Sequence, residues 1–173
     1  ERRNAWLSYK EADEKALEKL AKDYRTFLDN GKTERECVSE LSKEAEAAGY
    51  VSLDKKLASG EKIQTGDKIY AVGMKKIMVL FHIGEEPMEK GMNILGAHID
   101  SPRLDVKQNP LYEDTDLAYL DTHYYGGVKK YHWVALPLAI HGVIVKKDGT
   151  VVNVTVGEDE DDPVVYITDL LIH

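Results

Sequence analysis

Apolar residues in the first fifty positions recur at the three-to-four-residue spacing of amphipathic helices. An S-x-x-E capping box at residues 8–11 predicts the start of the first helix, and Asn30-Gly31 predicts its end. A second capping box at residues 33–36 opens another helix, which Gly49 closes. We therefore expect two helices joined by a short turn, serving as scaffold.

The pattern then changes to short apolar runs of strand length. Residues 68–74 and 76–82 predict two strands, and residues 92–98 predict a third. Residues 84–91 are polar and predict a loop. Because the run N-I-L-G-A at residues 93–97 is almost continuously apolar, we expect the third strand to be buried on both faces.

The second half of the chain is predicted to be rich in β-structure. Residues 105–121 are polar and predict irregular structure. Residues 133–145 and 151–156 predict strands joined by a hairpin turn at residues 147–149, and residues 164–167 predict one more strand. The change in pattern places a division near the start of this half.

Composition narrows the classes of function. The chain has 173 residues, enough for one domain or for one domain plus part of another. Its net charge of -8 disfavours nucleic acid and anionic membranes as partners. No apolar run reaches the roughly 20 residues that cross a bilayer, and the N-terminus has no signal-peptide pattern. Because residues 168–173 break off within an apolar run, we expect a fragment of a longer protein.

A single cysteine, Cys37, cannot form an internal disulfide, so nothing requires an oxidising compartment, and we expect a cytoplasmic protein. The thiol lies within a predicted helix and has no base partner nearby in the sequence. We expect a small buried or half-buried side chain rather than a nucleophile.

The segment with the most chemistry is G-A-H-I-D-S-P at residues 96–102. His98 falls at the end of a predicted strand, where side chains reach the crevice in which α/β sheets bind ligands. A neutral imidazole is a good zinc ligand. Asp100 follows two residues later and could accept the second ring N–H, which orients a ligand histidine. Pro102 favours a departure from regular strand there.

Spacing alone leaves other interpretations of His98 and Asp100 open. A structural histidine beside an aspartate is one, and an acid–base pair serving Ser101 as nucleophile is another, although no G-x-S-x-G elbow is present. The remaining histidines before the last residue are better explained by packing or hydrogen bonding. The acidic run at residues 158–162 lacks the spacing of a calcium loop and predicts a solvated loop.

Residues 96–107, GAHIDSPRLDVK, closely resemble the first metal-site motif of the aspartyl aminopeptidase family, G-x-H-x-D-S-P-x-L-x-V-K. Residues 125–127 with Trp133 resemble the family's Y-G-G-G-x-W-x-x-W segment, and residues 143–146 resemble the strand that follows it. The C-terminal segment 167–173, ITDLLIH, is similar to the family's I-P-H-L-A-I-H. The resemblance covers most of the chain.

This resemblance implies a metal-dependent aminopeptidase with two zinc ions, acting on peptide substrates. His98 would bind one metal ion, and Asp100 would orient its imidazole. His173 would enter the active site of a neighbouring subunit and contact substrate. The implied fold class is α/β: residues 1–103 form the N-terminal part of the metallopeptidase sheet domain, and residues 104–173 begin an inserted β-rich domain that builds a homo-oligomer. The other ligands and the general base would lie outside this chain.

Two departures indicate a divergent branch of that family. Residues 134–138, VALPL, stand where the family usually has F-D-R-D-L, so a charged pair is missing, and this weakens the expectation, implied by the resemblance, that acidic N-terminal residues are the preferred substrates. Thr168 and Asp169 replace the usual Pro-His ahead of His173. The alternative is a non-catalytic oligomerisation or binding module of the same fold, with Tyr124, Tyr125 and Trp133 at a subunit interface.

Overall fold

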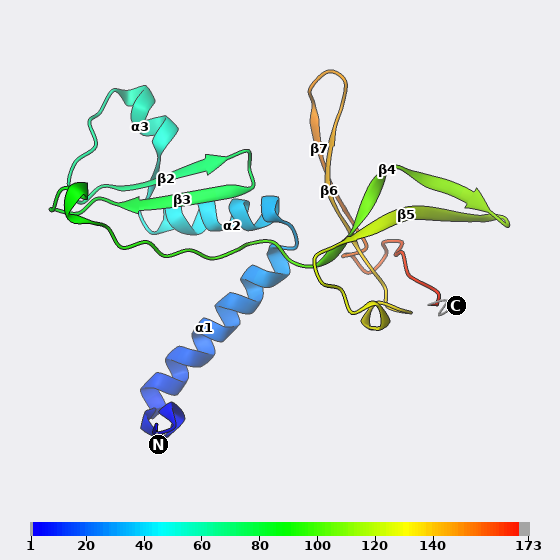
Figure 1. The fold of residues 1–173 in the computed structure, drawn as a ribbon, viewed down its shortest axis with the longest axis horizontal. Coiled ribbons are helices and arrows are strands. Elements are labelled where there is room, and N and C mark those ends of the chain that lie inside the picture. The colour runs from blue at the N-terminus through cyan, green and yellow to red at the C-terminus, as the bar shows by residue number, and fades with distance from the viewer. Residues whose placement is uncertain (1, 170–173) are drawn as a thin grey trace. The chain divides into compact units, whose positions relative to one another are not determined.

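Helices dominate the first part of the chain and β-hairpins the second (Figure 1). A computed structural model describes residues 2–169, which divide into a first unit up to residue 99 and a second unit from residue 100. The first unit contains η1 (Ala5–Ser8), α1 (Glu11–Asn30), α2 (Glu34–Ala47), β1 (Val51–Ser52), α3 (Leu53–Ser59), β2 (Lys68–Gly73), β3 (Ile77–His82) and η2 (Met88–Lys90). The second contains β4 (Arg103–Asp114), β5 (Leu117–Tyr125), η3 (Lys130–His132), β6 (Ile140–Val145) and β7 (Val151–Val156).

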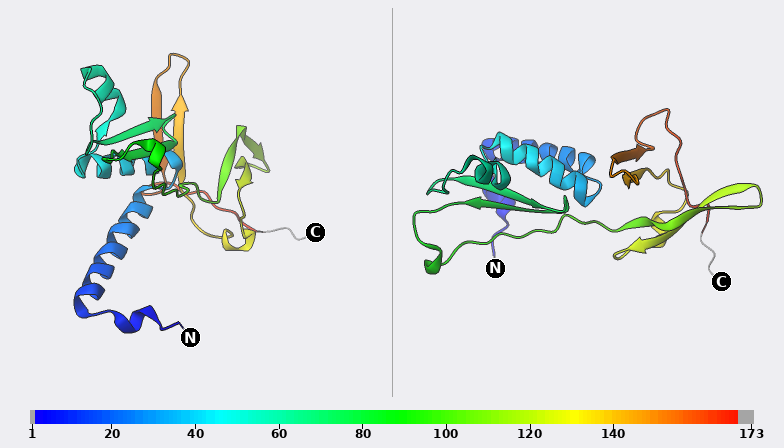
Figure 2. Two further views of the ribbon diagram at one scale, coloured as in Figure 1. Left: turned by 60° about the vertical axis from the view of Figure 1, so that its left-hand side comes forward. Right: turned by 90° about the horizontal axis from the view of Figure 1, so that it is seen from above.

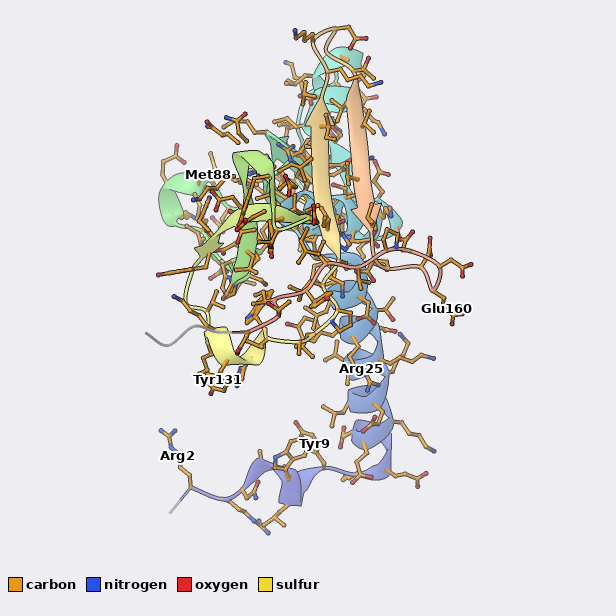
Figure 3. The ribbon with its side chains drawn as sticks, turned by 90° about the vertical axis from the view of Figure 1, so that its right-hand side faces the viewer. Arg2, Tyr9, Arg25, Met88, Tyr131 and Glu160 are labelled. Carbon is orange, nitrogen blue, oxygen red and sulfur yellow. The ribbon has the colours of Figure 1, made fainter. Side chains whose placement is uncertain are left out.

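The first helix forms as predicted, but its capping box does not. Ser8 ends the short η1 turn, where its Oγ donates a hydrogen bond to the Ala5 carbonyl oxygen at 2.6 Å. The start of α1 is capped instead by Asp13, whose Oδ2 accepts the backbone N–H of Lys10 at 2.9 Å. No residue of α1 is buried, and side chains stand out all round the helix, as at Arg25 (Figure 3).

The second capping box is confirmed. The backbone N–H of Thr33 donates to Oε2 of Glu36 at 2.8 Å, and the backbone N–H of Glu36 donates to Oγ1 of Thr33 at 3.4 Å. These reciprocal bonds satisfy two backbone donors that the first turn of α2 would otherwise leave without partners. Gly49 follows the helix with φ +85°, a conformation that glycine adopts without strain.

The core of the first unit lies between α2 and a three-stranded sheet of order β1-β2-β3, with β1 parallel and β3 antiparallel to β2. Helix α2 lies along one face of this sheet (Figure 2). Five residues of this core are buried, with 2% to 8% of their surface exposed: Cys37, Val38, Ala45, Ile69 and Tyr70. The buried Cys37 confirms the structural interpretation of that thiol, and the strands predicted at 68–74 and 76–82 are confirmed as β2 and β3.

The prediction of a third strand over residues 92–98 is wrong. These residues are irregular and exposed, with Ile94 80% and Leu95 99% accessible. A strand persists only where a neighbour supplies backbone hydrogen-bond partners, and within the described part of the chain β3 pairs with β2 alone. The apolar run is therefore present without the two layers that would bury it.

The polar region of the second unit also departs from prediction. Residues 105–121, expected to be irregular, belong instead to the antiparallel hairpin β4–β5. Its turn consists of Thr115 and Asp116, both at positive φ, which is the conformation of tight hairpin turns. The register shifts between Val106 and Leu111, around Pro110, which cannot donate to a ladder. This irregularity broke the alternation by which a strand is recognised in sequence.

The hairpin β6–β7 is confirmed, together with its turn at residues 147–149. The backbone N–H of Lys146 donates to the carbonyl oxygen of Thr150 at 2.8 Å, and Gly149 has φ +85°. The strand predicted over 133–145 is regular only from Ile140 onward. The strand predicted over 164–167 is reduced to isolated bridges, with Val165 opposite Leu138 as one of them.

The mixture of helices and sheets confirms the α/β class. The finer division at residue 104, into part of a metallopeptidase domain and part of an inserted domain, stays a prediction. Among the described residues, no helix combines the length and the hydropathy needed to cross a membrane.

Candidate metal and substrate site

His98 lies in the irregular segment that ends the first unit, and its side chain is exposed. The segment is tied to the helices by Cys37, whose Sγ contacts the carbonyl oxygen of Ile99 at 3.7 Å and that of Gly31 at 3.4 Å. A Cβ added to Gly31 would lie 2.9 Å from that Sγ, so glycine is needed for this approach. The backbone next to His98 therefore contacts the core of the first unit through a buried thiol.

Burial raises the pKa of the Cys37 thiol above its ordinary value, and the carboxylates of Glu36 and Glu34 add to that effect. A thiol with a raised pKa is a poor nucleophile and a poor metal ligand at neutral pH. Cys37 is therefore a buried side chain that contacts the segment next to His98.

Asp100 begins the second unit and is half-buried. Its Oδ2 accepts a hydrogen bond from the phenol O–H of Tyr125 at 2.9 Å. Strands β4 and β5 bring this about, because their register places Arg103 directly opposite Tyr125. The two sequence motifs that carry the family resemblance, at residues 96–107 and 125–127, thus meet in the structure.

The guanidinium of Arg103 lies over the ring of Tyr125. The carbon at the centre of its guanidinium lies 4.4 Å from the ring centroid, within the range of cation–π attraction. Its Nε donates to Oδ1 of Asp105 at 2.8 Å, in an ion pair whose side chains are each about a third exposed or less. Asp100, Tyr125, Arg103 and Asp105 therefore form one connected polar cluster, which we call the Asp100 cluster.

Gly126 and Pro102 close this cluster at the end of the hairpin. Gly126 has φ +73°, and a Cβ there would lie 3.6 Å from Pro102. The bend at Gly126 therefore lies next to Pro102, two residues after Asp100. The sequence signal for Tyr125 was its place in the Y-G-G motif, but residue spacing offered no reason to pair it with Asp100.

The other histidines do not join His98. His141 lies 2.8 Å from Glu158, with the imidazole Nε2 facing the carboxylate, and His132 packs edge-on against Tyr131, with ring centroids 4.2 Å apart. His173 lies outside the described residues. Within residues 2–169, no group of three or more His, Cys, Asp or Glu side chains is placed to hold a metal ion.

The acidic run at 158–162 is a solvated loop, as predicted, with Glu160 at its outer edge (Figure 3). Asp162 folds it back by accepting the backbone N–H of Gly157 at 2.8 Å. This hydrogen bond lies within the loop and stabilises a turn.

Comparison with known proteins identifies the family. Residues 27–173 match the family described as aminopeptidase I zinc metalloprotease, M18. A relative named "Probable M18 family aminopeptidase 1" from Clostridium acetobutylicum is 60% identical over 173 residues, which are 100% of this chain and 37% of that protein.

Two solved structures are similar along nearly the whole chain. Aminopeptidase I from Clostridium acetobutylicum superposes with a TM-score of 0.83 at 60% identity, covering 100% of this chain and 38% of that one. Aminopeptidase I from Borrelia burgdorferi superposes with a TM-score of 0.89 at 36% identity, covering 98% of this chain and 41% of that one.

The chain spans less than half the length of these relatives. Its match to the family nevertheless extends over most of its own length and includes both segments of the Asp100 cluster. The chain therefore belongs to the M18 family of zinc aminopeptidases.

Proposed function

We propose that the longer protein containing this chain is a zinc-dependent aminopeptidase that removes N-terminal residues from peptides, acidic residues among them. The observation that carries the proposal is the motif at residues 96–107, within a chain whose family match runs from residue 27 to residue 173.

His98 is the proposed zinc ligand of this chain. An exposed imidazole at the end of a segment is accessible to a metal ion, and neutral imidazole is among the preferred ligands of zinc. Bound zinc would supply polarisation of the peptide carbonyl and a water of lowered pKa. The donor chemistry of His98 and Asp100 fits such a group.

Asp100 is proposed to orient the imidazole of His98 by accepting its second ring N–H. A carboxylate partner fixes the tautomer of a ligand histidine and raises its basicity. Asp100 lies two residues from His98 in the chain and already belongs to an ordered polar cluster, which supports this role.

A single histidine cannot hold two metal ions, and the described residues contain no larger ligand group. We therefore assign the remaining ligands and the general base to parts of the longer relatives that this chain does not span. His173 is proposed to contact substrate in the active site of a neighbouring subunit of a homo-oligomer, and the second unit is proposed to belong to the domain that builds the oligomer.

We also propose that the protein acts in the cytoplasm. The support is that these 173 residues contain one cysteine, Cys37, which is buried and not in a disulfide. Neither the net charge of -8 nor any described helix favours nucleic acid or a membrane as partner.

The test uses the full-length protein and two histidine variants. We expect the wild-type protein to bind about two zinc ions per subunit and to hydrolyse N-terminal residues in a panel of peptides. His98→Ala should lose bound zinc and reduce kcat/KM by more than about 100-fold. His82→Ala, at the end of β3, is the matched control and should leave both unchanged, because His82 is exposed and is not part of the motif at residues 96–107.

The rival function, a non-catalytic module of the same fold, predicts a different set of results. A full-length protein that self-associates but binds no zinc and cleaves no peptide would establish that alternative. The panel also tests substrate preference, since the VALPL segment at residues 134–138 lacks the family's charged pair. Residues 1–173 alone should show no peptidase activity.

A further inference from the structure

We propose that Tyr125 is a positioning residue of the metal site, acting through Asp100. This inference rests on the proposed function, because it concerns how the carboxylate that orients His98 is itself held. It goes beyond that function by assigning a role to a residue outside the metal-site motif.

The contact that motivates it is short and specific. The phenol oxygen of Tyr125 lies 2.9 Å from Oδ2 of Asp100. An ionised carboxylate accepts only, in directions set by its plane, so a donor on one oxygen restricts rotation of the group about its Cβ–Cγ bond. That restriction also limits where the lone pairs that could receive an imidazole N–H point.

The chemistry of the donor suits this purpose. A phenol is neutral at physiological pH, so it orients the carboxylate without cancelling its charge. A lysine or arginine in the same place would compete with the imidazole for that charge. The phenol of Tyr125 therefore adds no positive charge of its own beside Asp100.

Tyr125 is itself firmly placed. Its backbone is paired with Arg103 in the β4–β5 ladder, and the Arg103 guanidinium lies over its ring at 4.4 Å. Asp105 anchors that guanidinium at 2.8 Å, and Gly126 turns the chain against Pro102 directly afterwards. A side chain 40% exposed would otherwise sample several rotamers, so this support is what makes it useful for positioning.

The experiment compares Tyr125→Phe with Tyr124→Phe in the full-length protein. Each substitution removes one phenol oxygen from neighbouring positions of β5, but alternate residues of a strand face opposite sides, and the hydroxyl of Tyr124 is not the one bonded to Asp100. We measure the zinc dissociation constant by chelator competition, the visible spectrum of the cobalt-substituted protein, and the pH profile of kcat/KM.

Tyr125→Phe should weaken zinc binding by about tenfold, the lower end for residues that support metal ligands from outside the first coordination layer. The cobalt spectrum and the pH profile should shift with it. Tyr124→Phe should match the wild-type protein in all three measurements. A Tyr125→Phe protein with wild-type zinc affinity and an unchanged cobalt spectrum would overturn the proposal.

A double-mutant cycle separates positioning from a general loss of folding. If Tyr125 acts through Asp100, then Tyr125→Phe should have no further effect on zinc affinity in an Asp100→Asn background. A loss that persists undiminished there would assign Tyr125 a merely structural role and contradict the inference. If the wild-type protein itself bound no zinc and cleaved no peptide, the proposed function would fail first, and the two failures remain distinguishable.

Discussion

The two units of this chain bury their side chains to very different degrees. The first places a helix on a three-stranded sheet and buries five side chains from α2 and β2. The second contains two separate two-stranded hairpins, and all of its described residues are half-buried or exposed. Strands with apolar residues therefore form a core only when a second layer of structure packs on them.

The accessible surface area of the chain is also large for its mass. It amounts to 14923 Å², whereas a compact protein of 19.5 kDa exposes about 8,500 Å² and two separate compact units of this combined mass expose about 10,000 Å². Much apolar surface is therefore accessible, including Leu111, Tyr112 and Leu117 near the end of the β4–β5 hairpin. The relatives are more than twice as long, so the rest of such a protein has this surface available to cover.

The largest expected effect comes from separating the units. Residues 100–173 expressed alone should show no cooperative thermal unfolding, because isolated two-stranded hairpins are marginally stable in water. Residues 1–99 should retain a cooperative transition, since they contain the α2–β2 core. Circular dichroism against temperature measures both. A sharp thermal transition in residues 100–173 alone would contradict the claim that only the first unit has a stable core.

Two isoleucines, one in each unit, allow the stability contributed by burial to be compared directly. Ile69 is 2% exposed in β2, and Ile144 is 57% exposed in β6. In the 173-residue chain, Ile69→Ala should lower the free energy of unfolding by about 2–5 kcal/mol, whereas Ile144→Ala should change it by less than about 0.5 kcal/mol. Urea unfolding measures both variants.

The same pair of variants in the full-length protein tests whether the second unit becomes covered there. A cost at Ile144 that rises toward that at Ile69 would mean that β6 is buried by the rest of the protein or by another subunit. Equal and small costs in both contexts would mean that the hairpin stays exposed.

The smallest effect expected is a pH dependence confined to the first unit. The phenol O–H of Tyr70 donates to Oε1 of Glu46 at 2.8 Å, and this bond, followed by the charge of Lys55, lowers the pKa of the Glu46 carboxyl below its ordinary value. A carboxyl with a lowered pKa in the folded state stabilises that state above its unfolded pKa, and the stabilisation is lost as pH falls through the folded pKa.

Tyr70→Phe should therefore be less stable than the wild-type chain near neutral pH, and the difference should shrink at an acidic pH below the lowered pKa of Glu46. Urea unfolding of both proteins at the two pH values provides the measurement. Tyr24→Phe, on the exposed α1, is the control and should leave stability unchanged at either pH. A difference that is constant with pH would show that the bond to Glu46 contributes nothing through its charge.

Local sequence signals predicted the elements that local chemistry controls. The Thr33–Glu36 capping box and the turn at residues 147–149 rest on contacts within a few residues, and the strands of the β2–β3 hairpin pair with each other across a short turn. The capping box at Ser8 was wrong because Asp13 offered a competing acceptor one turn further along. The hairpin β4–β5 was missed because Pro110 and the register shift hid its alternation.

The candidate site divides in the same way. His98 and Asp100 could be selected from the sequence, because a short motif carries both residues and suggests their chemistry. The partnership of Asp100 with Tyr125 could not be selected, since 25 positions separate the two residues and only the β4–β5 register closes that distance.

Sequence reasoning alone identified the motif at residues 96–107, the capping box that opens α2, and the family to which the chain belongs. These depend on side-chain identity and on interactions between near neighbours. The three-dimensional fold was needed to show that residues 92–98 are exposed, that Cys37 contacts the carbonyl oxygen of Ile99, and that Tyr125 donates a hydrogen bond to Asp100. Each of those outcomes depends on which distant backbone supplies hydrogen-bond partners and cover, and no pattern along a chain specifies that without the partner present.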